Sequence, residues 1–202
     1  YMLSCLSQRE LTRTLLPLGT LNKHDVRTIA EKNGLNIPES EESQDLCFLH
    51  GTNYRDYLKE HFDFSESPGP IKLSDGTLLA EHDGLSAYTI GQRKGLPAYK
   101  HALFVIEKRP SDNTLIVGGL EELGRNTFSV HAINWISGQA PKNLKKIHAK
   151  IRYRATMMAC EISLEEDNRA KIQTSTPLRD ITPGQFAVFY QGERVLGSGI
   201  IS

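Results

Sequence analysis

Residues 146–154 read Lys-Ile-His-Ala-Lys-Ile-Arg-Tyr-Arg, and their strict alternation is the clearest structural signal in the chain. Successive side chains of a β-strand point to opposite faces of a sheet. Every basic side chain of this segment therefore falls on one face, and every apolar or aromatic one falls on the other. The pattern predicts a half-buried strand over residues 147–154, with Tyr153 on the core side.

Further short strands are expected around this segment, from about residue 126 to the end of the chain. They lie at residues 128–135, 160–164, 170–173, 186–190 and 195–201. Closely spaced strands separated by turns favour a small antiparallel barrel or sandwich. The turn Thr182-Pro183-Gly184-Gln185 presents Gln185 at the start of one strand, and taken alone it is simply a tight turn.

The middle of the chain is also rich in β signals, after the break at Pro68-Gly69-Pro70. Asp75-Gly76 predicts a hairpin over residues 71–79, and a Pro-Ser-Asp-Asn turn predicts a second hairpin over residues 103–117. Glycines near residue 124 mark the next boundary. We therefore expect a central β-rich domain at residues 63–125.

The first part of the chain, residues 1–62, is expected to be helical. A capping box at Ser7–Glu10 predicts one helix running past Leu15, and Asn22 with Asp25 begins another that ends at Gly34. Thr52 or Asn53 caps a third. The expected class is α+β, mainly β, with a short helical N-terminal segment, a central β-rich domain and a C-terminal antiparallel barrel at residues 126–202.

Composition limits the classes of function. The chain has 24 Lys and Arg against 24 Asp and Glu, so its net charge gives no support for a nucleic-acid partner. It does contain a local basic segment at residues 142–154. No apolar run approaches the roughly 20 residues that cross a bilayer, so no membrane partner is expected. Because the chain begins at Tyr1 within structured sequence, we expect a fragment or a processed piece.

Three widely spaced cysteines, with no Cys-x-x-Cys pair, predict neither a metal site nor a disulfide framework, and a reducing cytoplasm fits them. Cys5 and Cys160 fit the role of small buried apolar side chains. Cys47 differs, because it follows the polar loop Ser43-Gln44-Asp45. Asp45 would raise the pKa of the Cys47 thiol unless a cation opposed it.

Gly91-Gln92-Arg93-Lys94-Gly95 is a glycine-flanked basic loop that follows an expected strand at residues 88–90. Glycines let the backbone turn sharply and approach a ligand, and the Arg93 guanidinium can pair bidentately with phosphate. Arg93 and Lys94 could also offset the effect of Asp45 on Cys47. The plain interpretation is a surface turn, just as the plain interpretation of the basic strand is a solvated face.

Together and in this order, these motifs resemble the tRNA-specific 2-thiouridylase family. The resembling segments are residues 1–4, 16–19, 43–48, 88–96, 152–154 and 182–190. The resemblance implies the C-terminal portion of the family, namely the central β-rich domain and the β-barrel. Family members carry an ATP-pyrophosphatase domain ahead of this portion.

The resemblance also implies a chemistry. Cys47 matches the cysteine that receives a persulfide from a sulfur-donor protein, either a cysteine desulfurase or a sulfur relay protein. The sulfur then passes to C2 of the wobble uridine of tRNA, and Cys47 finishes in a disulfide with another family cysteine. Arg152, Tyr153 and Gln185 match family positions that touch tRNA. Gln92, Arg93 and Lys94 are expected near the active-site end of the anticodon arm.

One departure from the family is large. The chain has no phosphate loop, and Cys5 lies in the wrong segment to be the family's first catalytic cysteine. ATP is therefore expected only in the full-length enzyme, with no cofactor on this chain, and the chain alone should not turn over. Two alternatives stay open: an RNA-binding β module with inert cysteines, or a thiol redox protein that uses Cys47.

Overall fold

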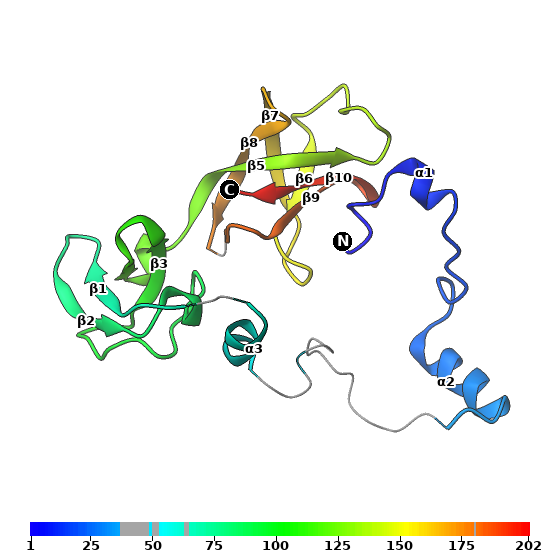
Figure 1. Ribbon diagram of the computed structural model, residues 1–202. Helices are drawn as coiled ribbons and strands as arrows, with labels where there is room; N and C mark the ends of the chain where they lie inside the picture. The colour runs from blue at the N-terminus through cyan, green and yellow to red at the C-terminus, as the bar shows by residue number, and fades with distance from the viewer. Residues whose placement is uncertain (37–48, 50–52, 63–64, 180) are drawn as a thin grey trace. The chain divides into compact units, whose positions relative to one another are not determined.

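The computed structural model describes residues 1–36, 49, 53–62, 65–179 and 181–202 (Figure 1). They form two compact units, Tyr1–Arg9 with Ser65–Ser202, and Glu10–Phe64. The fold is mainly β, with a short helical N-terminal part and a closed C-terminal barrel, which confirms the predicted class. Among the described helices, none is long and apolar enough to cross a membrane.

Two of the predicted helices begin at the predicted caps. Helix α2 spans Lys23–Lys32, and the Oδ1 atom of Asn22 accepts a hydrogen bond from the Asp25 N–H at 3.0 Å. Helix α3 spans Tyr54–His61, and the Asn53 side chain accepts from two backbone N–H groups of its first turn. Side-chain oxygens at these positions satisfy N–H groups that lack partners within the helix.

Helix α1 spans only Gln8–Leu11, so the prediction of a helix running past Leu15 is wrong. Beyond it the backbone forms β-turns. The Arg13 N–H donates to Glu10 O, and the Thr14 N–H donates to Leu11 O. The helix has no buried side chain. Short helices depend on the packing of an apolar face. Since α1 has no buried face, it ends after about one turn.

The central residues form a four-stranded sheet in the order β2-β1-β4-β3. Its strands are β1 (Gly69–Leu73), β2 (Leu78–His82), β3 (Phe104–Arg109) and β4 (Thr114–Gly118). Both predicted hairpins form, and β1 pairs with β4 in parallel between them. The buried core of this sheet consists of Ile71, Leu103, Val105, Leu115 and Val117.

Residues 88–90 lie within the described part of the chain, and the strand predicted there does not form. A 3-10 turn, η2 (Leu85–Ala87), is followed by irregular backbone and then by Gly91, whose φ of 83° ends any extended run. The loop is nevertheless fixed to β3. The Gly91 N–H donates to Val105 O at 2.8 Å, and the Val105 N–H donates to Gln92 O at 2.9 Å.

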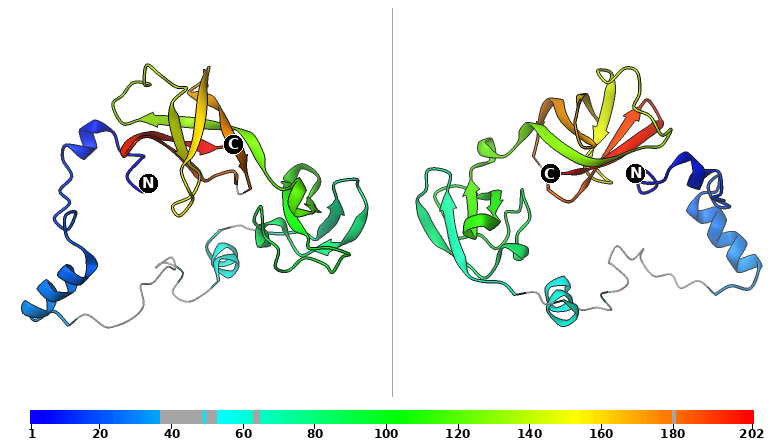
Figure 2. Two further views of the ribbon diagram at one scale, coloured as in Figure 1. Left: turned by 180° about the vertical axis from the view of Figure 1, so that it is seen from behind. Right: turned by 45° about the horizontal axis from the view of Figure 1, so that its top comes forward.

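The C-terminal residues form a closed antiparallel barrel in the order β10-β5-β8-β7-β6-β9. Its strands are β5 (Arg125–Trp135), β6 (Ile147–Lys150), β7 (Met158–Glu165), β8 (Arg169–Leu178), β9 (Phe186–Gln191) and β10 (Arg194–Ile201). The views in Figure 2 show these strands around one interior. Strand β9 pairs with β6 on one side and β10 on the other, and so closes the ring.

Strand β6 is shorter than predicted. The alternation holds as far as Ile151, whose side chain is buried like those of Ile147 and Ala149. The chain then turns, with the Ala155 N–H donating to Arg152 O at 3.1 Å. The prediction that Tyr153 is a core residue is therefore wrong, since its side chain is 64% exposed. The chain must reverse here to enter β7, and the alternating pattern alone does not show where it does so.

A glycine permits a close approach of two barrel strands, β10 and β5. Gly197 of β10 lies opposite Trp135 of β5, and a Cβ atom at Gly197 would lie 2.1 Å from the backbone oxygen of Asn134. No side chain fits there without a shift of the backbone. We therefore expect Gly197 to be needed for closure at this edge.

Replacing Gly197 by alanine should destabilise the barrel by about 1–3 kcal/mol, the range found for overpacked interiors. Urea unfolding of the chain measures this change. The control is Ser163→Ala at an exposed position of β7, which should change stability little. Equal stability of the Gly197→Ala variant and the parent chain would show that the strands can separate without cost.

Candidate functional site

The basic segment at residues 146–154 and the turn at residues 182–185 come together where strands β6 and β9 separate. The strands pair antiparallel with Lys150 opposite Val188. Continuing the same register leads from this pair to Tyr153 and Gln185. The turn that carries Tyr153 and the turn that carries Gln185 therefore leave the barrel at the same end, which we call the β6–β9 end.

The turn that carries Gln185 is firmly anchored. The Gln185 N–H donates to Thr182 O at 3.2 Å, and Gly184 has a φ of 84°, as expected after Pro183 in a type II turn. The Gly184 N–H donates to Ile201 O, and the Ile201 N–H donates to Gln185 O, at 2.9 and 2.8 Å. The backbone is thus tied to β10, while the Gln185 side chain is exposed.

Tyr1 connects the two turns, and sequence reasoning missed this role. Its hydroxyl donates to Phe186 O at 2.8 Å, and its ring packs in a T-shaped arrangement against Tyr153, with centroids 6.2 Å apart. Burial, and secondarily the nearby Tyr190, raise the pKa of Tyr1, so its hydroxyl stays protonated near neutral pH. Neither contact leaves a local signal, because the partners lie more than 150 positions away in the sequence.

The segment around Tyr1 is held to the barrel by several hydrogen bonds. The Asn134 side chain donates to Ser4 O and Leu6 O, at 3.0 and 3.1 Å. The buried Ser198 hydroxyl also donates to Ser4 O, at 3.2 Å. The Gln8 N–H donates to Ile136 O at 2.9 Å. Tyr1 therefore enters the β6–β9 end from a fixed backbone.

The β6–β9 end combines an exposed aromatic ring, an exposed amide and exposed guanidinium groups. Arg152 and Arg154 flank Tyr153 in the turn, and both are exposed. No acidic residue occurs between Lys142 and Arg154. Proteins that bind single-stranded nucleic acid combine aromatic stacking surfaces with cations for the phosphates. The chemistry of this surface is of that kind.

The glycine-flanked loop is shaped by its own glutamine. The Gln92 side chain accepts from the Thr89 N–H at 3.1 Å and donates to Lys94 O at 2.8 Å. Its amide atoms thus hold the loop in shape. The side chains of Arg93 and Lys94 are exposed. Of the three predicted loop residues, the two cations are the ones presented outward.

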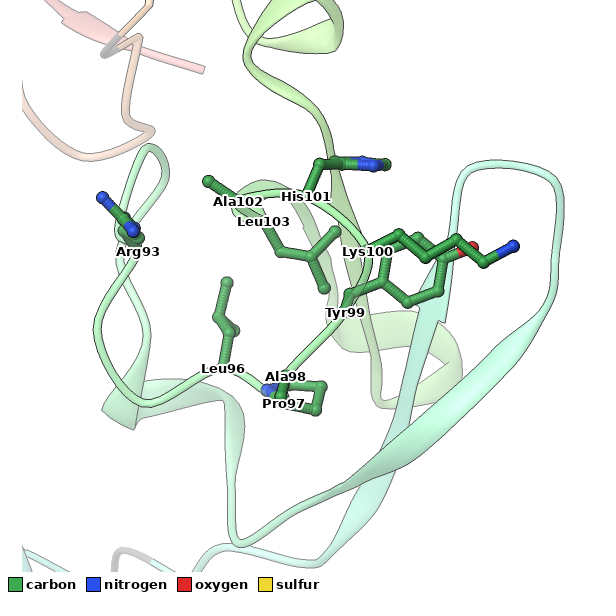
Figure 3. A pocket seen from close by; sticks show the side chains of 9 residues that line it. All are labelled: Arg93, Leu96, Pro97, Ala98, Tyr99, Lys100, His101, Ala102 and Leu103. Carbon is green, nitrogen blue, oxygen red and sulfur yellow. The ribbon is translucent and has the colours of Figure 1, made fainter.

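Beside this loop lies a hollow of about 410 Å³, lined by Arg93 and residues 96–103. Figure 3 shows Arg93 at one side and Lys100 at the other, with Leu96 and Leu103 between them. His101 also lines the hollow and packs edge-on against Tyr99, with ring centroids 5.2 Å apart. Its lining holds basic side chains and no acidic ones, so it suits an anionic group such as phosphate.

The loop does not fit the role of an ATP phosphate loop. Such loops lead directly into a helix, whose N-terminal N–H groups bind the phosphates. Residues 96–103 after the loop are irregular and lead into strand β3. No group of three or more His, Cys, Asp or Glu residues suited to a metal occurs among the residues that the structure describes.

The cysteines differ in their surroundings. Cys47 lies outside the described residues, so its assignment rests on its sequence motif. Cys160 is buried in the barrel core, and burial raises the pKa of its thiol to about 12, which leaves it inert. Cys5 is exposed, so the prediction of a buried role for it is wrong. It lies in a turn that places its thiol toward the Met2 oxygen, at 3.8 Å.

Three family models match the chain in succession. They are the tRNA methyl transferase HUP domain at residues 1–51, the tRNA methyl transferase PRC-barrel domain at residues 55–119, and the aminomethyltransferase beta-barrel domain at residues 125–201. The last two ranges contain the four-stranded sheet and the closed barrel.

Curated relatives match along the whole chain. Proteins named tRNA-specific 2-thiouridylase MnmA are 41% identical in Desulfotalea psychrophila, 42% in Herpetosiphon aurantiacus and 38% in Halothermothrix orenii, over 204, 203 and 202 residues. Each alignment covers 100% of this chain but only 59%, 56% and 56% of the relative. The chain thus spans somewhat more than half the length of these relatives. It belongs to the tRNA-specific 2-thiouridylase family.

Proposed function

We propose that the chain is the C-terminal part of an enzyme that forms 2-thiouridine at the wobble position of tRNA. In this proposal the chain binds the anticodon arm and carries the transferable sulfur on Cys47. One observation carries the binding half of it. Arg152, Tyr153 and Gln185, which the resemblance assigns to tRNA contact, all belong to the β6–β9 end. The names of the relatives, each a tRNA-specific 2-thiouridylase, support the substrate.

The β6–β9 end offers RNA three kinds of contact. Tyr153, 64% exposed, offers a ring for stacking, which is worth about 1–3 kcal/mol per base. Arg152 offers a cation for phosphate, and the Gln185 amide offers both a donor and an acceptor. Together these contacts can offset the few kcal/mol that it costs to take a base out of its stack.

A second contact is proposed at the hollow beside the glycine-flanked loop. Arg93 and Lys94 are exposed there, Lys100 and His101 line the hollow, and Gln92 keeps the loop in the shape that presents them. We propose that the hollow receives a backbone phosphate of the same RNA. A chain with zero net charge needs such local clusters, because it has no overall positive field.

The proposed sulfur chemistry uses Cys47 as a carrier. A donor protein, a cysteine desulfurase or a sulfur relay protein, transfers sulfane sulfur to the Cys47 thiolate. The terminal sulfur of the resulting persulfide then attacks C2 of the uridine, whose activated oxygen leaves with the adenylate, and the thiolate of a second cysteine of the enzyme breaks the persulfide S–S bond by forming a disulfide with Cys47. ATP, whose site we place in the part of the enzyme ahead of this chain, supplies the activation of the base.

The proposed division of the chain follows from these roles. Residues 1–62 carry Cys47 as the remainder of the catalytic domain, residues 63–125 form the central domain with the loop, and residues 126–202 form the barrel that contacts tRNA. We place the enzyme in the cytoplasm, where thiols stay reduced and tRNA is at hand.

Replacing Cys47 by serine in the complete enzyme should abolish thiolation of tRNA, because serine cannot carry sulfane sulfur. Binding of tRNA should change by less than about twofold, since one small side chain is exchanged for another of similar size. Transfer of radiolabelled sulfur and a filter-binding assay measure the two properties. Thiolation by the serine variant would contradict the assignment and favour an RNA-binding module with inert cysteines.

Replacing Arg152 by alanine should weaken binding to all tRNAs to a similar extent. It should also lower the slope of log K against log salt by about one, because one phosphate contact is lost. The matched control is Lys171→Ala, an exposed cation on β8 of the same barrel. An unchanged slope for Arg152→Ala would mean that Arg152 belongs to an ordinary solvated surface.

A further inference from the structure

Tyr153 lies on a turn, and its side chain is 64% exposed. A tyrosine held only by its own backbone samples several rotamers, and fixing it on a ligand costs entropy. The Ala155 N–H donates to Arg152 O at 3.1 Å in this turn, a bond that fixes the backbone but not the χ angles of the Tyr153 ring. A ring that serves as a stacking surface benefits from restraint by a neighbour.

Tyr1 is placed to supply that restraint. Its ring lies 6.2 Å from the Tyr153 ring, at 67° between the planes, which is a favourable edge-to-face geometry. Its hydroxyl is fixed by Phe186 O at 2.8 Å, and Phe186 directly follows Gln185. The segment behind it is pinned to Asn134, Ser198 and Ile136. Tyr1 therefore links both turns of the β6–β9 end to the barrel wall.

We propose that Tyr1 is a positioning residue, which holds the Tyr153 ring in the orientation that receives a nucleobase. This inference rests on the proposed function, since it presupposes that the β6–β9 end binds RNA. The T-shaped contact covers only part of the Tyr153 ring, and most of the side chain stays open to solvent. Tyr1 acts through Tyr153, and its hydrogen bond to Phe186 O holds the Tyr1 ring itself in place.

In this proposal the segment around Tyr1 belongs to the RNA-binding surface. Its backbone is bonded to the barrel, not only to its own neighbours in sequence. The Tyr1 hydroxyl remains a donor over the whole neutral range, because burial raises the pKa of Tyr1. The hydrogen bond from Tyr1 to Phe186 O is thus kept throughout the neutral range.

A double-mutant cycle on RNA binding tests the proposal. The probe is a fluorescein-labelled anticodon stem-loop, and its anisotropy reports the affinity of the 202-residue chain. Tyr153→Ala should weaken binding about tenfold through loss of stacking. Tyr1→Ala should weaken it about fivefold in the parent chain, through loss of the restraint, and by little or nothing in the Tyr153→Ala background.

Two further variants guard against a purely structural effect. Tyr1→Phe keeps the ring and loses the bond to Phe186 O, so it should fold like the parent and weaken RNA binding by less than Tyr1→Ala. Tyr54→Ala removes an exposed tyrosine from helix α3, outside the β6–β9 end, and serves as the control. Thermal unfolding of each variant separates lost stability from lost binding.

The possible results are distinguishable. Equal losses from Tyr1→Ala in both backgrounds would overturn the positioning role, because Tyr1 would then contribute independently of Tyr153. No loss from Tyr1→Ala, with a clear loss from Tyr153→Ala, would overturn it as well and leave the proposed function intact. If neither tyrosine affects the affinity for RNA, the proposed binding surface itself fails.

Discussion

The backbone hydrogen bonds of strand β9 are the interaction on which the rest of the barrel depends. Strand β9 pairs with β6 along one edge and with β10 along the other, so it closes the ring and leaves no free strand edge there. Four successive residues of β9, from Ala187 to Tyr190, are buried. The register of β9 against β6 also decides which turns share an end of the barrel, and hence where Tyr153 and Gln185 lie.

The proposed activity requires a chain with no net charge to bind a polyanion. Local clusters of exposed cations can provide this binding. Exposed cations lie at both proposed contacts, in the turn from Arg152 to Arg154 and around the hollow near Arg93. Each contact with a phosphate adds affinity that salt weakens, whereas stacking on Tyr153 is much less sensitive to salt. A surface of both kinds keeps the RNA in register without requiring a large overall charge.

Much of the fold could be predicted because its signals are local. Helix caps at Asn22 and Asn53 and the two central hairpins each depend on a few neighbouring residues, and all form as predicted. The end of β6 could not be predicted, because it depends on where the partner strands run out. For the same reason the alternating pattern places Tyr153 on the core side, although its side chain is exposed. The link made by Tyr1 is a contact between distant segments, which no spacing in the sequence reveals.

Hydroxyl-radical footprinting tests whether the β6–β9 end of the barrel binds RNA. Oxidation of the chain is compared by mass spectrometry with and without a bound anticodon stem-loop. RNA should protect Tyr153 and Phe186, which are 64% and 40% exposed, but not Leu164, which is 49% exposed at the end of β7. Unchanged oxidation of Tyr153 and Phe186 in a chain saturated with RNA would show that RNA does not bind at this end of the barrel.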